Sequence, residues 1–213
     1  MADLILALDL PGRPEVLRML DRLPALRWVK VGSLLMTREG PPLVRELVSR
    51  GLQVFLDLKW HDIPNTVAGA VLAAQELGVH LVTVHASGGE AMMRAAAAAA
   101  TPSLSVVGVT VLTSQPAAPG AVERLAQSAL AAGLAGVVCS PREVAAVRAL
   151  TPAAGLIVVP GIRRTQDARD DQERIAGPAD AVSAGATHLV IGRPILDAAE
   201  PSAALEDFLS AMA

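Results

Sequence analysis

Aromatic residues are scarce in this 213-residue chain, where they make up 2% of the sequence and tyrosine is absent. Proteins that bind single-stranded nucleic acid stack the bases on aromatic side chains, and proteins that bind duplexes need positive charge against the phosphates. The formal net charge here is −3, so the chain offers neither feature. We therefore do not expect nucleic acid as a partner.

Long apolar runs and paired cysteines are also missing. Hydrophobic residues make up 52% of the chain, yet no uninterrupted apolar run reaches the roughly 18 residues that a membrane span needs. The segment 1–6 has no basic residues ahead of its apolar residues and does not have the pattern of a secretion signal. The single cysteine, Cys139, cannot form an intrachain disulfide, which suits a reducing compartment. We expect a cytoplasmic protein without membrane contact, in which Cys139 is a buried small apolar residue.

Lysine is the third scarce residue. Of the 18 basic residues 16 are arginine, and the two lysines, Lys30 and Lys59, stand at the ends of apolar runs. Arginine cannot replace lysine where a proton must be delivered, because the guanidinium stays charged in proteins. If the two lysines were present only by chance, we would expect them on exposed helix faces. Their positions therefore indicate a functional role.

Short β-like runs alternate with longer helical patterns along the chain. The predicted strands span residues 4–9, 28–32, 54–59, 81–86, 105–112, 136–140, 156–161 and 188–192. The predicted helices span residues 14–23, 42–50, 64–77, 90–100, 121–132, 142–150, 178–184 and 202–212. Apolar strands that are each followed by a helix indicate a parallel sheet covered on its outer face.

Eight such units in a chain of this length predict an α/β fold, a single-domain (β/α)8 TIM barrel over residues 1–213. A doubly wound open sheet is the alternative. That fold typically carries Gly-x-Gly-x-x-Gly after its first strand, where this chain has Asp9-Leu10-Pro11-Gly12.

Charged residues follow directly after the apolar run 54–56. In a strand, alternate side chains share a face, so Asp57 and Lys59 are predicted to emerge side by side at the carboxyl end of the strand, with Asp62 in the turn that follows. A structural ion pair explains an isolated Asp-x-Lys equally well. The interpretation depends on what the other strands deliver to the same place.

The carboxyl ends of barrel strands converge on one mouth, where active sites form. Polar residues stand at the ends of at least six predicted strands: Asp9, Lys30, Asp57, Lys59, His85, Thr113, Ser114, Arg163 and Arg193. The segments Gly161-Ile162-Arg163 and Gly192-Arg193 follow the seventh and eighth strands, a frequent phosphate site in such barrels. Arginine there supplies a fork that matches phosphate oxygens.

The expected mouth contains three aspartates and two lysines, whose charges sum to −1. The chain lacks a recognisable Ser-His-Asp set, a His or Cys metal signature and a nucleotide-cofactor loop, so we expect neither metal nor cofactor. What remains is proton transfer beside a fixed carboxylate, on a phosphorylated small molecule.

Several motifs together resemble the orotidine 5′-phosphate decarboxylases, in that family's order from Asp9 to Pro194. They are Lys30-Val31-Gly32, Asp57-Leu58-Lys59-Trp60-His61-Asp62-Ile63-Pro64-Asn65-Thr66, Val84-His85-Ala86-Ser87-Gly88-Gly89, Leu112-Thr113-Ser114, Pro160-Gly161-Ile162-Arg163 and Gly192-Arg193-Pro194. Asp-x-Lys-x-x-Asp alone is shared with sister barrel enzymes that act on sugar phosphates. The Asp-Ile-Pro-Asn-Thr and Pro-Gly-Ile-Arg segments are more specific.

The resemblance implies a reaction that yields UMP and CO2 in pyrimidine biosynthesis without a cofactor. It implies that Lys59 protonates C6 of the pyrimidine, that Asp57 lies against the substrate carboxylate, and that Lys30 links Asp57 to the ribose. It implies further that Asp62 and Thr66 reach the neighbouring site of a homodimer. The remaining substrate-binding residues that it implies are Asp9, Ile63, Thr113, Ser114, Pro160, Arg163, Gln172, Gly192 and Arg193.

Two alternatives share the same barrel. One is a Mg²⁺-dependent sugar-phosphate decarboxylase or synthase that holds its metal on Asp57 and Asp62. The other is a non-catalytic nucleotide-binding barrel, which the intact Asp57, Lys59 and Asp62 argue against.

Overall fold

The computed structural model of the chain describes residues 2–164 and 176–213, and its strands close into a parallel barrel in the order β1 to β8. The strands are β1 (Asp3–Ala7), β2 (Trp28–Gly32), β3 (Gln53–Trp60), β4 (Leu81–His85), β5 (Ser105–Val109), β6 (Gly136–Val138), β7 (Leu156–Pro160) and β8 (His188–Ile191). The predicted (β/α)8 barrel is confirmed.

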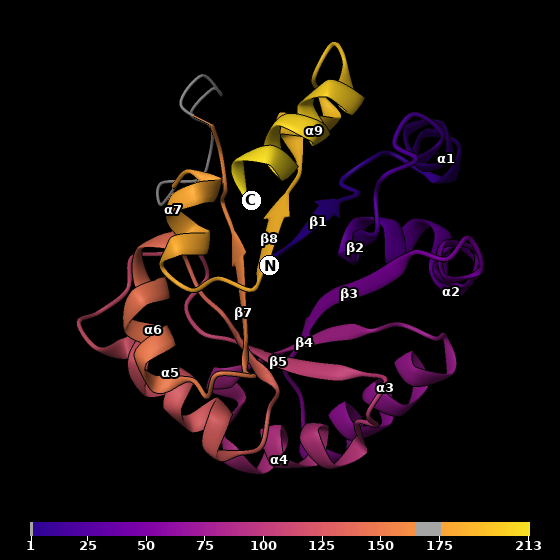
Figure 1. The fold of residues 1–213 in the computed structure, drawn as a ribbon. Helices are drawn as coiled ribbons and strands as arrows, with labels where there is room; N and C mark the ends of the chain where they lie inside the picture. The colour runs from indigo at the N-terminus through magenta and orange to yellow at the C-terminus, as the bar shows by residue number, and fades with distance from the viewer. Residues whose placement is uncertain (1, 165–175) are drawn as a thin grey trace.

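The helices form an outer ring around the strands in chain order (Figure 1). They are α1 (Arg13–Asp21), α2 (Ser33–Ser49), α3 (Pro64–Glu76), α4 (Glu90–Ala99), α5 (Ala121–Ala131), α6 (Val144–Leu150), α7 (Pro178–Ser183), α8 (Arg193–Leu196) and α9 (Pro201–Ala211), with short 3-10 turns at Ala86–Gly88 and Pro141–Glu143. None of the helices in the described part of the chain is long and apolar enough to cross a membrane.

Strand alternation divides the core into two layers. The smaller layer fills the inside of the barrel and includes Phe55, Leu81, Val107, Val158 and Val190. The larger layer lies between the outer face of the strands and the helices, and it receives the intervening strand residues. Because both faces of every strand are covered, the strands are almost continuously apolar, as the sequence pattern predicts for a parallel sheet.

Close strand packing explains one glycine in β6. A Cβ atom added to Gly136 would lie 2.0 Å from the carbonyl oxygen of Leu156 on β7. No side chain fits at that distance, so the two strands can approach only because Gly136 has none.

Most predicted boundaries lie within two residues of the observed ones, and two differ by more. The strand predicted to reach residue 112 ends at Val109, which pairs with the last residues of both neighbouring strands, His85 of β4 and Val138 of β6. Helix α2 begins at Ser33, well before residue 42, and is interrupted at Gly40, whose φ is +63°. The predicted helix over residues 42–50 is therefore the second of two helical segments that meet at the Gly40 kink, and the first, from Ser33, was not predicted.

The cysteine prediction is confirmed. Cys139 is fully buried, and burial raises the pKa of its thiol to about 12. A thiol with that pKa is almost entirely protonated near neutral pH and is a poor nucleophile.

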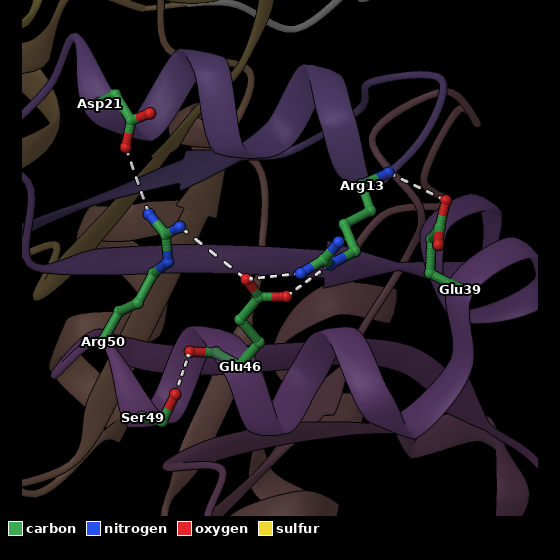
Figure 2. Close-up of polar contacts among 6 residues, drawn as sticks. All are labelled: Arg13, Asp21, Glu39, Glu46, Ser49 and Arg50. Atoms are coloured by element: carbon green, nitrogen blue, oxygen red, sulfur yellow. Dashed lines mark hydrogen bonds and ion pairs between the residues drawn. The ribbon is translucent and has the colours of Figure 1, made fainter.

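A network of charged side chains joins α1 to α2 (Figure 2). The Arg13 guanidinium donates to both carboxylate oxygens of Glu46, at 2.6 and 3.1 Å, while the Arg13 backbone N–H donates to Glu39 at 2.9 Å. Arg50 lies 3.8 Å from Glu46 and 3.3 Å from Asp21. The hydrogen bond to Arg13 lowers the pKa of Glu46. Although exposed pairs contribute little stability, these bonds fix the start of α1, which follows the loop that carries Asp9.

Candidate active site

A cavity of about 240 Å³ opens at the carboxyl ends of the strands. Its polar and loop lining comprises Asp9, Lys30, Asp57, Lys59, Thr113, Pro160, Gly161, Arg163, Gly192, Arg193 and Pro194, and its apolar lining comprises Ala7, Phe55, Val109, Val111, Leu112, Val138, Val158, Ile162 and Val190. Residues from seven of the eight strands, or from the loops that follow them, therefore share one pocket.

Four of the lining side chains form a chain of alternating charge. Lys30 Nζ lies 3.2 Å from Asp9 Oδ1 and 3.9 Å from Asp57 Oδ2, and Lys59 Nζ lies 2.8 Å from the same Asp57 oxygen. The side chains of Lys30 and Asp57 are only 13% and 11% exposed, whereas Lys59 is 35% exposed. Each inner charge thus faces an opposite one, which offsets the cost of placing it away from water.

The backbone of Lys59 has an unusual conformation. Its φ is +52°, and among the residues that the structure describes no other non-glycine residue has a positive φ. Here β3 advances by four residues, from Leu56 to Trp60, while the paired strand β4 advances by two, from Val82 to Val84. The bulge brings the Lys59 side chain to Asp57, and a left-handed residue of this kind is often found at a functional site.

A residue that the sequence reasoning missed supports this bulge. Thr83, in the middle of β4, donates its hydroxyl to Asp57 Oδ1 at 2.9 Å and accepts the backbone N–H of Lys59 at 2.9 Å. Strand alternation could have revealed it, because Thr83 lies two residues after Leu81, which faces the barrel interior.

The two predicted anion-binding segments lie in the same cavity. Arg163 is buried, at 7% exposed, and follows Gly161, whose φ of +80° turns the chain out of β7. Arg193 begins α8 directly after Gly192. A Cβ added to Gly192 would lie at ordinary contact distance from Ala7 Cβ (3.4 Å) and Asp9 Oδ2 (3.8 Å), so Gly192 faces the pocket beside β1.

Several predicted site residues do not line the cavity of this chain. Asp62, Ile63, Thr66 and Ser114 are exposed, and the Asp62 carboxylate accepts the N–H of Ile63 at 2.7 Å. Gln172 lies outside the described residues, as does most of the loop after β7.

Two histidines, His61 and His85, lie near the carboxyl ends of β3 and β4. The rings of His61 and His85 are 5.7 Å apart. Burial has the largest effect on the pKa of His85 and lowers it, and the electrostatic interactions with His61 and Lys59 lower it further. Within the described residues, no three His, Cys, Asp or Glu side chains gather as a metal site.

Residues 2–208 match the family described as orotidine 5′-phosphate decarboxylase / HUMPS. The chain belongs to this family. An orotidine 5′-phosphate decarboxylase of Dichelobacter nodosus is 47% identical, with 98% of each chain covered, and one of Halorhodospira halophila is 51% identical, with 94% of this chain and 92% of the relative covered.

A solved structure agrees with this family assignment. The crystal structure of orotidine 5′-phosphate decarboxylase from Lactobacillus acidophilus superposes with a TM-score of 0.87 at 34% identity, covering 100% of this chain and 99% of the other. The two chains therefore share one fold over nearly their full lengths.

Proposed function

We propose that this chain is a carboxy-lyase that converts orotidine 5′-phosphate to UMP and CO2 in pyrimidine biosynthesis. The observation that carries the proposal is the 2.8 Å contact between Lys59 Nζ and Asp57 Oδ2, in a cavity that also holds two arginines. Family membership and the names of the relatives support the same substrate.

The reaction needs a positively charged group beside one carbon atom of the substrate, C6. Loss of CO2 from C6 leaves an electron pair in an orbital orthogonal to the π-system of the ring, so delocalisation into the ring cannot stabilise it. A fixed ammonium beside C6 stabilises that charge as it develops, because it needs no reorganisation at the moment of reaction. In this proposal Lys59 supplies the ammonium and then transfers a proton to C6.

Asp57 and Lys30 hold that ammonium in place. Asp57 binds Lys59 and also faces Lys30. The Lys59 ammonium is therefore held by a carboxylate whose negative charge is also offset by the Lys30 ammonium. Asp57 would also lie against the substrate carboxylate. The repulsion between these two carboxylates is relieved when the substrate group leaves as neutral CO2. Lys30 and Asp9, 3.2 Å apart, would bind the ribose hydroxyls.

The remaining lining residues would bind the rest of the nucleotide. Arg163, Arg193 and the backbone of Gly192 are suited to the 5′-phosphate, and Pro160 and Thr113 to the pyrimidine. Ser114 and Gln172 keep the substrate-binding roles that the resemblance gave them. Phosphate binding far from C6 would contribute energy that is used to orient the reacting groups.

Assay of turnover tests the function directly. We expect the pyrimidine absorbance of orotidine 5′-phosphate to change with enzyme, at the same rate in excess EDTA. A strict requirement for Mg²⁺ would instead favour the sugar-phosphate alternative. Lys59→Ala should lose turnover by a factor of at least about 10⁴, since it removes both the proton donor and the electrostatic stabilisation. The same variant should still bind UMP.

We further propose a homodimer in which Asp62 and Thr66 reach the partner's site. Both are exposed and lie outside the cavity of their own chain, and their neighbour Ile63 is 66% exposed although it is apolar. Two-fold dimers of this kind place the same surface of both subunits in contact.

Mixed dimers test the shared site. Lys59→Ala and Asp62→Ala chains are each expected to be inactive alone. If equal amounts are unfolded and refolded together, half of the dimers are mixed, and each mixed dimer has one intact site. Activity should therefore recover to about a quarter of the wild-type value, the share expected for a two-fold dimer. No recovery would contradict the shared site.

A further inference from the structure

Thr83 is the most deeply placed polar residue near the proposed reacting groups. It is 0% exposed and does not line the cavity. Leu81, two residues earlier in β4, pairs with Phe55 of β3 inside the barrel. One step further toward the mouth, alternation brings Thr83 level with Asp57.

The hydroxyl of Thr83 both accepts and donates a hydrogen bond. The Lys59 backbone N–H can only donate and the Asp57 carboxylate can only accept, so the direction of both 2.9 Å hydrogen bonds is fixed. Thr83 therefore receives from the backbone of one proposed catalytic residue and donates to the side chain of the other. A buried hydroxyl with both bonds satisfied holds its neighbours rigidly.

This pairing has two geometric effects. It occupies Asp57 Oδ1, which leaves Oδ2 to the two ammonium groups, at 2.8 Å from Lys59 and 3.9 Å from Lys30. It also gives the Lys59 N–H a partner at the bulge, where the regular pairing of β3 with β4 is interrupted. The left-handed Lys59 backbone and the orientation of the Asp57 carboxylate thus depend on the same oxygen atom.

We infer that Thr83 is a positioning residue, which acts through Asp57 and Lys59 and does not contact the substrate. The part of this inference that concerns turnover rests on the proposed function. Because Thr83 fixes the reacting geometry and not the phosphate or ribose contacts, its removal should lower kcat and leave substrate binding nearly unchanged.

Three substitutions isolate the hydroxyl. Thr83→Val keeps the shape and removes the hydroxyl, and we expect kcat to fall about 10- to 100-fold with KM and UMP affinity within about twofold of wild type. Thr83→Ser restores a hydroxyl and should keep kcat within about threefold of wild type. Thr83→Ala removes the hydroxyl without placing a methyl group against the Asp57 carboxylate, so it should fold even if the valine variant does not. A water molecule in the vacated space would satisfy Asp57 and the Lys59 N–H but would not be fixed to β4, so we expect the same loss of kcat.

A second measurement does not depend on turnover. The chain has only two lysines, so protein made with 13Cε-labelled lysine should show two side-chain signals in NMR spectra, assigned with Lys30→Arg and Lys59→Arg. A held side chain has two inequivalent Hε protons. We expect this inequivalence for Lys59 in wild type and Thr83→Ser, and its collapse in Thr83→Val or Thr83→Ala.

The outcomes separate the two proposals. A wild-type protein without decarboxylase activity contradicts the proposed function, whereas the lysine signals still test the role of Thr83. Wild-type kcat and unchanged Lys59 signals in Thr83→Val and Thr83→Ala would overturn the positioning role. Equal impairment of Thr83→Ser and Thr83→Val would also overturn it, because the hydroxyl would then not be the group that matters.

Discussion

The left-handed backbone of Lys59 leads to a prediction in which glycine is a better substitute than alanine. Lys59→Ala and Lys59→Gly both remove the ammonium, so both lose the 2.8 Å contact with Asp57. They differ only in the Cβ atom. At the φ of +52° a Cβ approaches the backbone too closely, at a cost of about 1–2 kcal/mol, and glycine avoids that cost.

Glycine also carries a penalty, because the unfolded chain is more flexible. That penalty is about 0.5–1 kcal/mol relative to alanine. The net expectation, from the midpoints of these two ranges, is that Lys59→Gly is more stable than Lys59→Ala by about 0.75 kcal/mol. For a chain of this size the melting temperature would be higher by about 1–4 °C.

Urea unfolding of the two variants, followed by circular dichroism, measures the difference. The matched control is Leu58, the preceding residue of the same strand, which has no positive φ. There the order should reverse, with Leu58→Gly less stable than Leu58→Ala. If Lys59→Ala proved the more stable of its pair, as at Leu58, the Lys59 backbone would not be strained and the bulge argument would be wrong.

Three further predictions concern the rest of the barrel. Cys139 should react with a thiol reagent only after unfolding, because it is buried with a thiol pKa of about 12, and the rate of reaction in native buffer measures this. Burial lowers the pKa of His188, so as the pH falls the unfolded state binds a proton at His188 at a higher pH than the folded state does. The free energy of unfolding should therefore fall as the pH drops below about 6.5, and less steeply in His188→Gln, as urea titrations at pH 7.5 and 5.5 would show. Gly136→Ala should destabilise the barrel by more than about 3 kcal/mol or prevent folding, because the new Cβ would overlap the Leu156 carbonyl. The control is Gly69→Ala, in an open helical position of α3, which should be neutral or stabilising. Thermal unfolding measures both variants.

The order of elements was predictable because it depends on local pattern. The eight strands appear in β-like apolar runs and eight of the helices follow them, so hydrophobic alternation and glycine stops were sufficient for these elements. Helix α8 was not predicted, because its four residues are too few to show a helical period. The end of β5 was not predictable, since residues 110–112 are as apolar as a strand. It depends on where the neighbouring β6 ends, at Val138, which is a property of the sheet and not of the segment.

The site was predictable where it lies at the ends of strands. Asp9, Lys30, Asp57 and Lys59 line one cavity, as barrel topology requires. Thr83 was missed because it lies in the middle of a strand, and its contact with Lys59 depends on a bulge that no local signal in β3 announces.

Arg164 makes a contact that the sequence does not reveal. Its guanidinium lies 3.0 Å from Asp207 and 4.8 Å from the centroid of the Phe208 ring, and its side chain is only 19% exposed. Both partners belong to α9, more than 40 residues away in sequence, so local pattern carries no trace of the contact.

The placement of the two lysines has a practical consequence. Apart from the terminal amine, every primary amine of the chain belongs to the charged array in the cavity, and of the two lysines Lys59 is the more exposed. An amine-selective acylating reagent would therefore act as an active-site titrant: the lysine amines that it modifies would count competent sites, and a saturating nucleotide should protect them. Coupling to an amine-reactive support would likewise inactivate the protein it captured through a lysine, so immobilisation calls for a different handle.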